Sequence, residues 1–408
     1  MRGTPKGFRL HIGLFGRRNV GKSSLLNALT RQTVSIVSDV AGTTTDPVEK
    51  PMELLPLGPV LFIDTAGLDD VGALGQLRVD RTRQVFDRTD VGILVAEAGA
   101  WGEFETAILD ELAQRKIPAV AVLNKVDLAD PPAAVLAKLA ERKVPVVRTI
   151  ASRGEGLLDL REALIAAAPE EFMSAPTILG DLVPAGEMAV FVVPIDLEAP
   201  RGRLILPQVQ SIRDVLDNDA YCLVVKEREL RDALDRLKRP PVLVVTDSQG
   251  FLKVAADTPP DVPMTSFSIL FSRLRGDLNE FVRGAMAIDR LRPGAKVLIA
   301  EACSHHPIGE DIGRVKIPRW LTNYVGGKLD FTTVQGHDFP DPPAGFDLVI
   351  HCGACMWNRR EMLSRILRCR RAGVPITNYG MAIAYSLGLF ERALGPFPAA
   401  LDVFRQPR

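Results

Sequence analysis

Residues 16–24 read GRRNVGKSS and stand between an apolar stretch, HIGLF at 11–15, and a helix-forming stretch, SSLLNALT at 23–30. This is the phosphate-binding loop pattern in the context that it requires, because a strand precedes the glycines and a helix follows them. The glycines let backbone N–H groups approach phosphate oxygens, and the helix N-terminus adds its positive dipole end. An accidental glycine-rich turn is the alternative. The stretch by itself predicts an α/β domain that binds a nucleotide.

The side chains of this loop have expected roles of their own. Lys22 reaches the outer phosphate oxygens, and the hydroxyl of Ser23 is placed on Mg2+. The loop residues expected to bind the nucleotide are Gly16, Asn19, Val20, Gly21, Lys22, Ser23 and Ser24.

Two later motifs favour a nucleotide site over an accidental turn. DTAG at 64–67 ends an apolar strand, where Asp64 can act on Mg2+ through water and the Gly67 N–H can sense a γ-phosphate. NKVD at 124–127 follows another apolar strand. A carboxylate there accepts two hydrogen bonds from the adjacent N–H donors of guanine, whereas adenine presents an acceptor at one of those positions. We therefore expect GTP or GDP, with the base held by Asn124, Lys125 and Asp127.

The fifth GTPase motif departs from the usual pattern. The common SAK appears as IAS at 150–152, before RGEG at 153–156. No particular base contact is predicted from this loop.

The order and spacing of these motifs resemble those of the translation-factor-like GTPases, and the loop AGTTTD at 41–46 is similar to AGTTRD of the TrmE and Era-like branch. Among its threonines, 43–45, the register with that branch favours Thr44 as the Mg2+ ligand. Leu68 stands where Ras-like enzymes have a glutamine that orients water. In the TrmE group a phosphate-loop asparagine helps hold a K+ ion that stimulates hydrolysis, and Asn19 occupies that position. The alternative is that Asn19 serves local hydrogen bonds of the loop.

Composition limits the class of protein. The 408 residues predict two or three domains. Lys and Arg together number 50, as do Asp and Glu, so no broad basic field attracts nucleic acid. No apolar run approaches the roughly 18 residues that span a bilayer, and the first residues lead into the glycine-rich loop. Five cysteines are too few for a disulfide framework, so we expect a cytoplasmic protein in a reducing compartment, with no membrane partner.

The pattern along the chain predicts an α/β fold class: an N-terminal P-loop GTPase domain with a mostly parallel sheet, followed by two smaller α/β domains. Short apolar runs alternate with helix-period segments up to about residue 169, and a linker is expected at about 170–187. The predicted domains are residues 1–170, 171–264 and 265–408. One long helix is expected at 271–291.

Two short stretches concentrate the metal-binding residue types. CSHHP from Cys303 and HCGAC from His351 hold three of the five cysteines and three of the five histidines. Each stretch follows a strand candidate, and the carboxyl ends of parallel strands share one edge of a sheet, so the two stretches should lie side by side. The candidate ligands are Cys303, His305, His351, Cys352 and Cys355.

Three kinds of site remain open from this chemistry. Zinc would take four of these ligands in a closed tetrahedron. A 4Fe-4S cluster with three cysteines would leave one iron to a histidine or open to another group. The third possibility is a packed set of unliganded cysteines. Asn358 should cap a helix whose N-terminus faces the site, and Lys316 and Arg319 could add positive charge.

The other cysteines and histidines carry no ligand pattern. Cys222, in a predicted strand, and Cys369, in an amphipathic segment, are expected to be buried structural residues. His11 and His337 have no partner pattern, and His306 adjoins His305.

A TrmE-like GTPase domain joined to CxH...HCxxC resembles the HydF family of [FeFe]-hydrogenase maturation GTPases over nearly the whole chain, including 199–216, which looks like that family's dimerisation segment. The resemblance implies a K+-stimulated GTP hydrolase that needs Mg2+, forms a homodimer through its middle domain and binds a 4Fe-4S cluster in its last domain. Cys303, Cys352 and Cys355 match the cluster-ligating cysteines, and His305 and His351 match the family's two histidines, either of which could be the fourth ligand.

The same resemblance implies a scaffold that receives a diiron unit built with the radical-SAM partners HydE and HydG and delivers it to apo-hydrogenase. Our hypothesis is that the nucleotide state changes partner binding or release. The alternatives are a GTPase with a structural zinc domain acting in RNA modification or ribosome assembly, and a purely regulatory GTPase switch.

Overall fold

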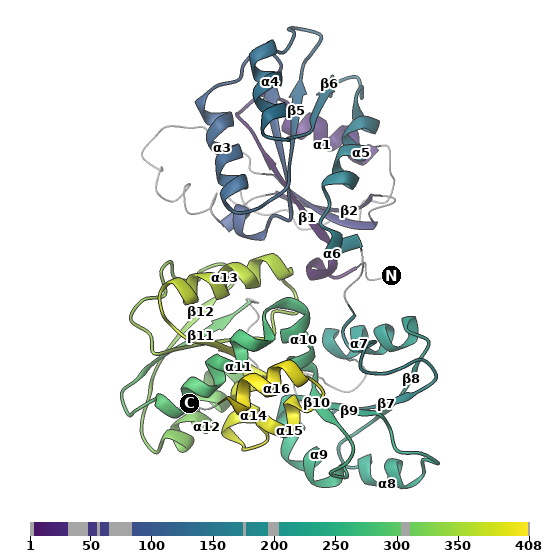
Figure 1. The fold of residues 1–408 in the computed structure, drawn as a ribbon, viewed down its shortest axis with the longest axis vertical. Coiled ribbons are helices and arrows are strands. Elements are labelled where there is room, and N and C mark those ends of the chain that lie inside the picture. The colour runs from purple at the N-terminus through teal and green to yellow at the C-terminus, as the bar shows by residue number, and fades with distance from the viewer. Residues whose placement is uncertain are drawn as a thin grey trace. The chain divides into compact units, whose positions relative to one another are not determined.

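The structure is a computed structural model of the chain and describes residues 4–31, 48–54, 58–64, 84–173, 177–194, 204–302 and 311–406. The chain divides into two compact units, Met1–Ala175 and Pro176–Arg408, and each is described by itself (Figure 1). Both are built from sheets covered by helices, which confirms the predicted α/β fold class. Within these ranges no helix is long and apolar enough to cross a bilayer.

The first unit contains one sheet with the strand order β2-β3-β1-β4-β5-β6. Its strands are Leu10–Phe15 (β1), Val48–Leu54 (β2), Gly58–Asp64 (β3), Val91–Glu97 (β4), Ala119–Asn124 (β5) and Val146–Thr149 (β6). All pairs are parallel except β2 with β3, which is antiparallel. The sequence pattern missed β2, an edge strand that contains Pro51 and three charged residues. Edge strands tolerate proline because one side of their backbone needs no ladder partner.

Helices cover both faces of this sheet (Figure 1). They are Lys22–Arg31 (α1), Glu103–Gln114 (α3), Ala133–Glu141 (α4), Leu157–Ala167 (α5) and Glu170–Met173 (α6), and a 3-10 turn, Lys6–Phe8 (η1), precedes β1. Leucines of α1 and α5 join one face of the strands in a buried cluster, and α3 and α4 join the opposite face in another. Side chains alternate between these clusters along β3 and β4, which fits strands that are buried on both faces.

The second unit begins with a parallel sheet in the order β10-β9-β7-β8. Its strands are Met188–Val192 (β7), Tyr221–Val225 (β8), Leu243–Thr246 (β9) and Met264–Ser266 (β10). The elements between them are Leu206–Asp217 (α7), Leu230–Asp235 (α8), Ser248–Gly250 (η2) and Phe251–Asp257 (α9). Strand β8 ends this sheet and has exposed side chains on both of its faces, with Tyr221 48% and Val224 41% exposed.

A second parallel sheet of this unit has the order β12-β11-β13-β14. Its strands are Lys296–Glu301 (β11), Asp330–Gln335 (β12), Leu348–His351 (β13) and Ile376–Asn378 (β14). The surrounding helices are Phe267–Arg275 (α10), Leu278–Met286 (α11), Ala287–Arg290 (η3), Ile312–Lys316 (η4, a π-turn), Ile317–Val325 (α12), Arg359–Arg371 (α13), Tyr379–Ser386 (α14), Phe390–Leu394 (α15) and Pro398–Arg405 (α16).

The single long helix predicted at 271–291 is wrong, because the chain breaks at Gly276. Asp277 caps α11 by accepting the Glu280 N–H through its side chain at 3.1 Å. A Cβ at Gly276 would lie 2.5 Å from the Phe281 ring, so the break also needs a residue without a side chain. The pattern of an Asp followed three residues later by a Glu could have located this helix start.

Candidate functional sites

The loop between β1 and α1 has the backbone shape that its glycines allow. Gly16 has φ +144° and a Cβ there would lie 2.2 Å from the Val95 carbonyl oxygen. Gly21 has φ +100° and a Cβ there would lie 2.2 Å from Asn124 Nδ2. Asn19 also has a positive φ of 62°, which asparagine tolerates better than most side chains. The loop is therefore pressed against the ends of β4 and β5 and could not take larger residues at these glycines.

Lys22 begins α1 and keeps its ammonium inside this loop. It is 7% exposed. Its Nζ donates to the carbonyl oxygens of Gly16 and, at 2.6 Å, of Arg17. The charge is thus held at the place where the phosphate-binding pattern needs it.

The next residue of α1 reaches the end of β3. Ser23 Oγ donates to Asp64 Oδ2 at 3.4 Å. Burial raises the pKa of the Asp64 carboxyl, although the nearby Lys22 opposes that effect. In the part of the chain that the structure describes, the other carboxylate oxygen, Asp64 Oδ1, is buried without a hydrogen-bond partner. A hydroxyl beside a buried carboxylate with an unsatisfied oxygen is a donor set that suits Mg2+. The other predicted ligand, Thr44, lies outside the described residues, as do Gly67 and Leu68.

Asn124, at the end of β5, connects the loops that surround the base position. Its Nδ2 donates to the Val20 carbonyl oxygen at 2.8 Å. Its Oδ1 accepts from Thr149 Oγ1 and from the Ala151 N–H, both at 3.0 Å. The atypical fifth motif is therefore tied to the phosphate loop through one buried amide. The sequence pattern identified Asn124 but missed the hydroxyl of Thr149.

The remaining residues of the base motif also lie at this edge of the sheet. Lys125 has φ 61° and forms an ion pair with Glu97, at the end of β4. The Asp127 carboxylate lies 3.6 Å from Nη2 of Arg153, which belongs to the turn after the fifth motif. Asp127 and the fifth motif are thus neighbours, as a shared base site requires.

A charged clamp between the phosphate loop and α3 had no sequence signal. Arg17 Nε and Nη2 donate to the two carboxylate oxygens of Glu105 at 2.8 Å and 3.1 Å. Glu105 has no exposed surface, and its Oε2 also accepts the Gly102 N–H at 2.8 Å. The guanidinium lies 5.5 Å from the Phe104 ring centre. Because these partners are 88 positions apart in sequence, no local pattern reveals them.

In the second unit, the ends of β11 and β13 lie side by side, as predicted. Ala300 pairs with His351 in register, and the Cys352 N–H donates to the Ala300 carbonyl oxygen at 2.8 Å. The Ala302 N–H donates to Cys352 Sγ at 3.0 Å. The residue directly before Cys303 is therefore in contact with the second cysteine of the predicted set. Cys303 and His305 themselves lie outside the described residues.

The turn after β13 carries the two described cysteines of the set. Cys352 and Cys355 are both partly buried and neither is in a disulfide, and Ala354 between them has φ 47°. The predicted helix cap is confirmed, because Asn358 Oδ1 accepts the Glu361 N–H at 3.2 Å at the start of α13. Within the described ranges, no three His, Cys, Asp or Glu side chains are grouped closely enough to hold a metal.

Of the two other cysteines, Cys369 lies in α13 and is fully buried, as expected. Cys222 lies in β8 and is only partly buried, in contrast to the expectation. Burial raises the pKa of the Cys369 thiol to about 12. Lys316, proposed from sequence to face the cysteines, contacts Gln249 through its Nζ.

His351, the last residue of β13, has both ring nitrogens in hydrogen bonds. Nδ1 lies 2.9 Å from the Cys352 carbonyl oxygen, and Nε2 lies 3.1 Å from Nη1 of Arg365. The ring has no exposed surface. Burial, together with the Arg365 charge, lowers the pKa of His351 to about 3, so the ring is neutral.

His337, for which no partner was predicted, lies beside this buried ring with 31% of its own side chain exposed. Its Nδ1 lies 2.7 Å from Glu361 Oε1, and its ring stacks on Trp357 at 5.5 Å. His11 in the first unit is also buried, and its ring nitrogens lie 3.2 Å from the Arg88 and 3.1 Å from the Lys6 carbonyl oxygens.

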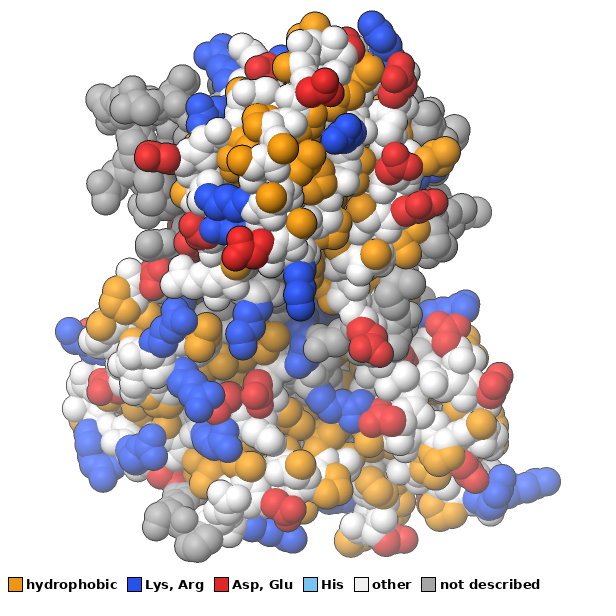
Figure 2. Space-filling view, turned by 45° about the horizontal axis from the view of Figure 1, so that its top comes forward, with side chains coloured by type: hydrophobic (Ala, Val, Ile, Leu, Met, Phe, Trp, Pro, Cys, Tyr) orange, Lys and Arg blue, Asp and Glu red, His pale blue; other side chains and the backbone are white. Residues whose placement is uncertain are grey.

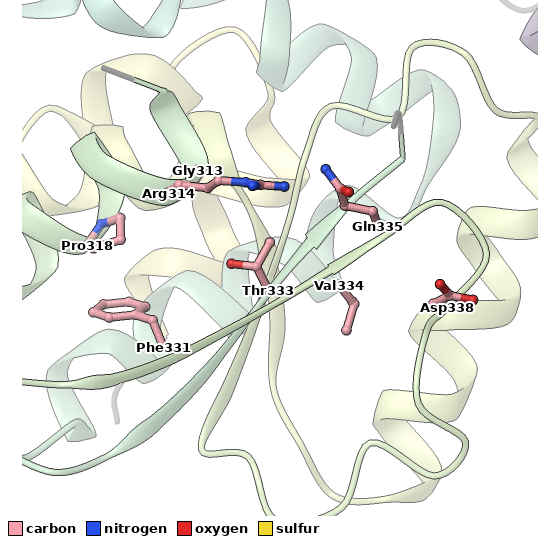
Figure 3. Close-up of a pocket in the computed structure, with 8 residues that line it drawn as sticks. All are labelled: Gly313, Arg314, Pro318, Phe331, Thr333, Val334, Gln335 and Asp338. Atoms are coloured by element: carbon pink, nitrogen blue, oxygen red, sulfur yellow. The ribbon is translucent and has the colours of Figure 1, made fainter. Parts of the chain in front are cut away.

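A groove of about 500 Å3 lies on the other side of β11, between η4 and β12 (Figure 3). Arg314 and Gln335 point toward each other across it, and both donate to Glu301 Oε2, at 3.1 Å and 3.0 Å. Phe331 and Pro318 line its apolar end. Glu301 is buried and ends β11, two positions before Cys303, so the groove adjoins the strand that leads into the cysteine stretch.

Family profiles match three parts of the chain. Residues 11–125 match a GTPase family described as 50S ribosome-binding GTPase. Residues 178–276 match the hydrogen maturase F dimerization domain, and residues 279–396 match the hydrogen maturase F tetramerization domain.

Individual relatives match the GTPase part. The tRNA modification GTPase MnmE of Synechococcus sp. (strain JA-2-3B'a(2-13)) is 40% identical over 158 residues, which are 38% of this chain and 32% of that protein. GTPase Der of Wolinella succinogenes is 38% identical over 123 residues, which are 29% of this chain and 26% of Der. The chain thus spans about a third or less of the length of these relatives.

Solved structures also resemble the chain. The G domain of the T. maritima iron transporter FeoB is 25% identical, with a TM-score of 0.31, and the match covers 39% of this chain and 98% of that domain. Era of Aquifex aeolicus, bound to GDP and AlF4−, is 18% identical, with a TM-score of 0.33, over 61% of this chain and 99% of Era. A GTPase domain followed in one chain by both hydrogen maturase F domains is the architecture of that family, and the chain belongs to the hydrogen maturase F (HydF) family.

Proposed function

We propose that the chain binds and hydrolyses GTP and acts as the scaffold on which the diiron unit of [FeFe]-hydrogenase is carried and delivered. The GTPase part of the proposal is supported by the three loops that meet at Asn124 and by the contact of Ser23 with Asp64. Ser23, Asp64 and Thr44 would hold Mg2+, which neutralises charge on the phosphates. Lys22 places its ammonium in the same loop.

K+ stimulation of hydrolysis is a further part of the proposal and involves Asn19. Leu68 supplies no group that could orient water, so charge stabilisation must come from elsewhere. Asn19 lies in the phosphate loop, and its φ of 62° is outside the range of a right-handed helix. A K+ ion held there would add positive charge where negative charge develops on the phosphates.

The carrier part of the proposal assigns a 4Fe-4S cluster to Cys303, Cys352 and Cys355. The donor chemistry of the described residues fits, because Cys352 and Cys355 are two thiols on one turn that are not joined in disulfides, and the Ala302 N–H donates to Cys352 Sγ. A hydrogen bond to sulfur stabilises a thiolate ligand. A cluster held by three thiolates supplies an iron with an open position for cargo. The observation that carries this assignment is the contact of Ala302 with Cys352, since it sets the residue before Cys303 against the second cysteine stretch.

The proposed partners are a second copy of the chain, the radical-SAM maturases HydE and HydG, and apo-hydrogenase. Self-association is supported by the two matched domains, which are named for dimerization and tetramerization. On the face drawn in Figure 2, positive and negative side chains are interspersed, as expected for a chain with equal numbers of both. The balanced charge of the whole chain supports protein partners rather than nucleic acid.

Anaerobic reconstitution with iron and sulfide tests the carrier proposal. Bound iron, sulfide and zinc are counted, and the EPR spectrum is recorded after reduction. We expect a 4Fe-4S signal that is lost or weakened in Cys303→Ser, Cys352→Ser and Cys355→Ser. Cys222→Ser is the matched control, because this thiol lies in β8, away from the set, and it should keep the full signal. Stoichiometric zinc with no cluster would overturn the carrier role and leave a GTPase with a structural metal.

A further inference from the structure

The buried residues behind the cysteine turn indicate what His351 does. The inference rests on the proposed cluster site but concerns residues that the structure describes. An arginine side chain has only N–H donors. Since Arg365 Nη1 lies 3.1 Å from His351 Nε2, that nitrogen must be the acceptor and cannot carry a proton. The proton of the neutral ring is therefore on Nδ1, which donates to the Cys352 carbonyl oxygen at 2.9 Å.

Arg365 is held in place independently of this contact. Its Nη2 donates to the Gly336 carbonyl oxygen at 2.6 Å, just beyond β12. Its guanidinium lies over the Trp357 ring at 3.9 Å and the Phe339 ring at 4.6 Å from the ring centres. The residue is only 3% exposed, and Glu361 lies 4.0 Å away as its carboxylate partner. A buried cation with this many contacts does not move without the loss of several of them.

Either mode of metal ligation by His351 would break this arrangement. Ligation through Nε2 needs the lone pair that accepts from Arg365, and it would bring a metal toward a buried cation. Ligation through Nδ1 requires that this nitrogen lose its proton while it faces the Cys352 carbonyl oxygen. The ring is also fully buried, with the Trp357 ring 5.4 Å away at its edge.

We propose that His351 is a hydrogen-bonding support of the cysteine turn and not a metal ligand, with Arg365 as the positioning residue that occupies its Nε2. The Nδ1–H of His351 fixes the carbonyl group of Cys352, and the N–H of that residue is fixed by Ala300. Both ends of the Cys352 backbone are thus set before any metal binds. The fourth position of a cluster then falls to a group other than His351.

The first test is the tautomer of His351 in metal-free full-length protein with 15N-labelled histidines. The His351 signals are assigned by their loss in His351→Gln. We expect a proton on Nδ1 and none on Nε2 at neutral pH. Arg365→Lys keeps a donor and should keep the Nε2 resonance of the parent, whereas Arg365→Met leaves Nε2 without this donor and should shift that resonance while the proton stays on Nδ1. A proton on Nε2 of His351 in the parent protein would overturn the proposal. The spectrum of the parent is sufficient for this test, so the proposal can be refuted even if Arg365→Met does not fold.

The second test uses the metal-loaded protein. In reduced, reconstituted protein, pulsed EPR should show no nitrogen coupling that is lost in His351→Gln. His337→Gln is the control, because this second histidine also contacts Trp357, and it should give the same spectrum as the parent. A coupling that is lost in His351→Gln would refute the proposal. Zinc-loaded protein is measured by NMR in the same way, with the Nδ1–H signal expected to persist. If the protein takes up neither iron nor zinc, the carrier function fails, while the metal-free spectrum still decides whether Arg365 holds His351.

Discussion

Asn124 shows how one side chain can set the geometry of a whole site. Its amide donates to the phosphate loop and accepts from two groups of the loop after β6. All these atoms are buried, where a lost hydrogen-bond partner costs about 1–3 kcal/mol. Asn124, predicted as part of the base motif, therefore also holds the loops together.

Asn19 permits a sharp test of K+ stimulation. Asn19→Gly removes the side chain while keeping a residue that adopts φ 62° freely, whereas Asn19→Ala adds backbone strain of about 1 kcal/mol. We expect both variants to bind GTP nearly as well as the parent and to lose the difference in hydrolysis rate between K+ and Na+. Steady-state rates in the two salts check this. Equal rates for the parent in both salts would contradict the K+ role itself.

His11 predicts an acid-sensitive first unit. Burial is the largest effect on its pKa and lowers it from the ordinary 6.5, against the opposing effects of Asp90 and the Lys6 carbonyl. Below pH 6.5 the unfolded chain therefore binds a proton that the folded chain does not. The free energy of unfolding should fall with decreasing pH by up to about 1.4 kcal/mol per pH unit. Denaturant unfolding between pH 7 and 5 measures the slope, and His11→Gln should reduce it. An identical slope in that variant would assign the effect to other groups.

At the scale of elements, the Arg17 and Glu105 clamp joins the phosphate loop to the start of α3. Arg17 is about half exposed and Glu105 is fully buried, so loss of the arginine leaves a buried carboxylate with fewer partners. We expect Arg17→Ala to cost about 1–3 kcal/mol in the free energy of unfolding and to weaken nucleotide binding. Arg18→Ala is the matched control at the next loop position. A double-mutant cycle with Glu105→Gln measures the coupling, and a coupling near zero would show that the clamp does not support the loop.

Strand β8 is the element best placed to join two copies of the chain. It ends its described sheet, and its Tyr221 and Val224 side chains are 48% and 41% exposed. A lysine in an edge strand opposes pairing with another strand. Val224→Lys should therefore shift the protein to a smaller oligomer in sedimentation analysis. Leu252→Lys is the control, because Leu252 is 58% exposed on α9 and should leave the oligomer unchanged. Unchanged sedimentation of Val224→Lys would place the interface elsewhere.

At the scale of the whole molecule, the nucleotide is expected to act as a switch for partner binding. The γ-phosphate orders contacts in GTPases of this kind, and its loss releases them. We expect the affinity for apo-hydrogenase to differ about 10-fold between GDP and a non-hydrolysable GTP analogue, which is about 1.4 kcal/mol of coupling. Lys22→Ala lacks the phosphate-binding ammonium, so its affinity for apo-hydrogenase should be the same with GDP and with the GTP analogue. If the parent protein binds apo-hydrogenase equally well with both nucleotides, the switch hypothesis is refuted.

Local patterns determined much of this molecule from its sequence. The strands β1, β3, β4, β5 and β6, the phosphate loop, the cap at Asn358 and the neighbouring ends of β11 and β13 all follow from periodicity or from residues a few positions apart. The exceptions are instructive, since Lys50 and Pro51 interrupt the apolar alternation of β2 and the break at Gly276 interrupts a helical pattern that is otherwise continuous.

Tertiary structure alone decided the long-range polar contacts. Arg17 meets Glu105, Asn124 meets Val20, and Arg365 meets both Gly336 and His351, at separations that no local rule covers. These groups are buried, and a buried polar group must find a partner wherever the fold brings one. Sequence pattern could therefore name His351 as a possible ligand, whereas the packing of α13 against β13 determined that both of its nitrogens already have partners.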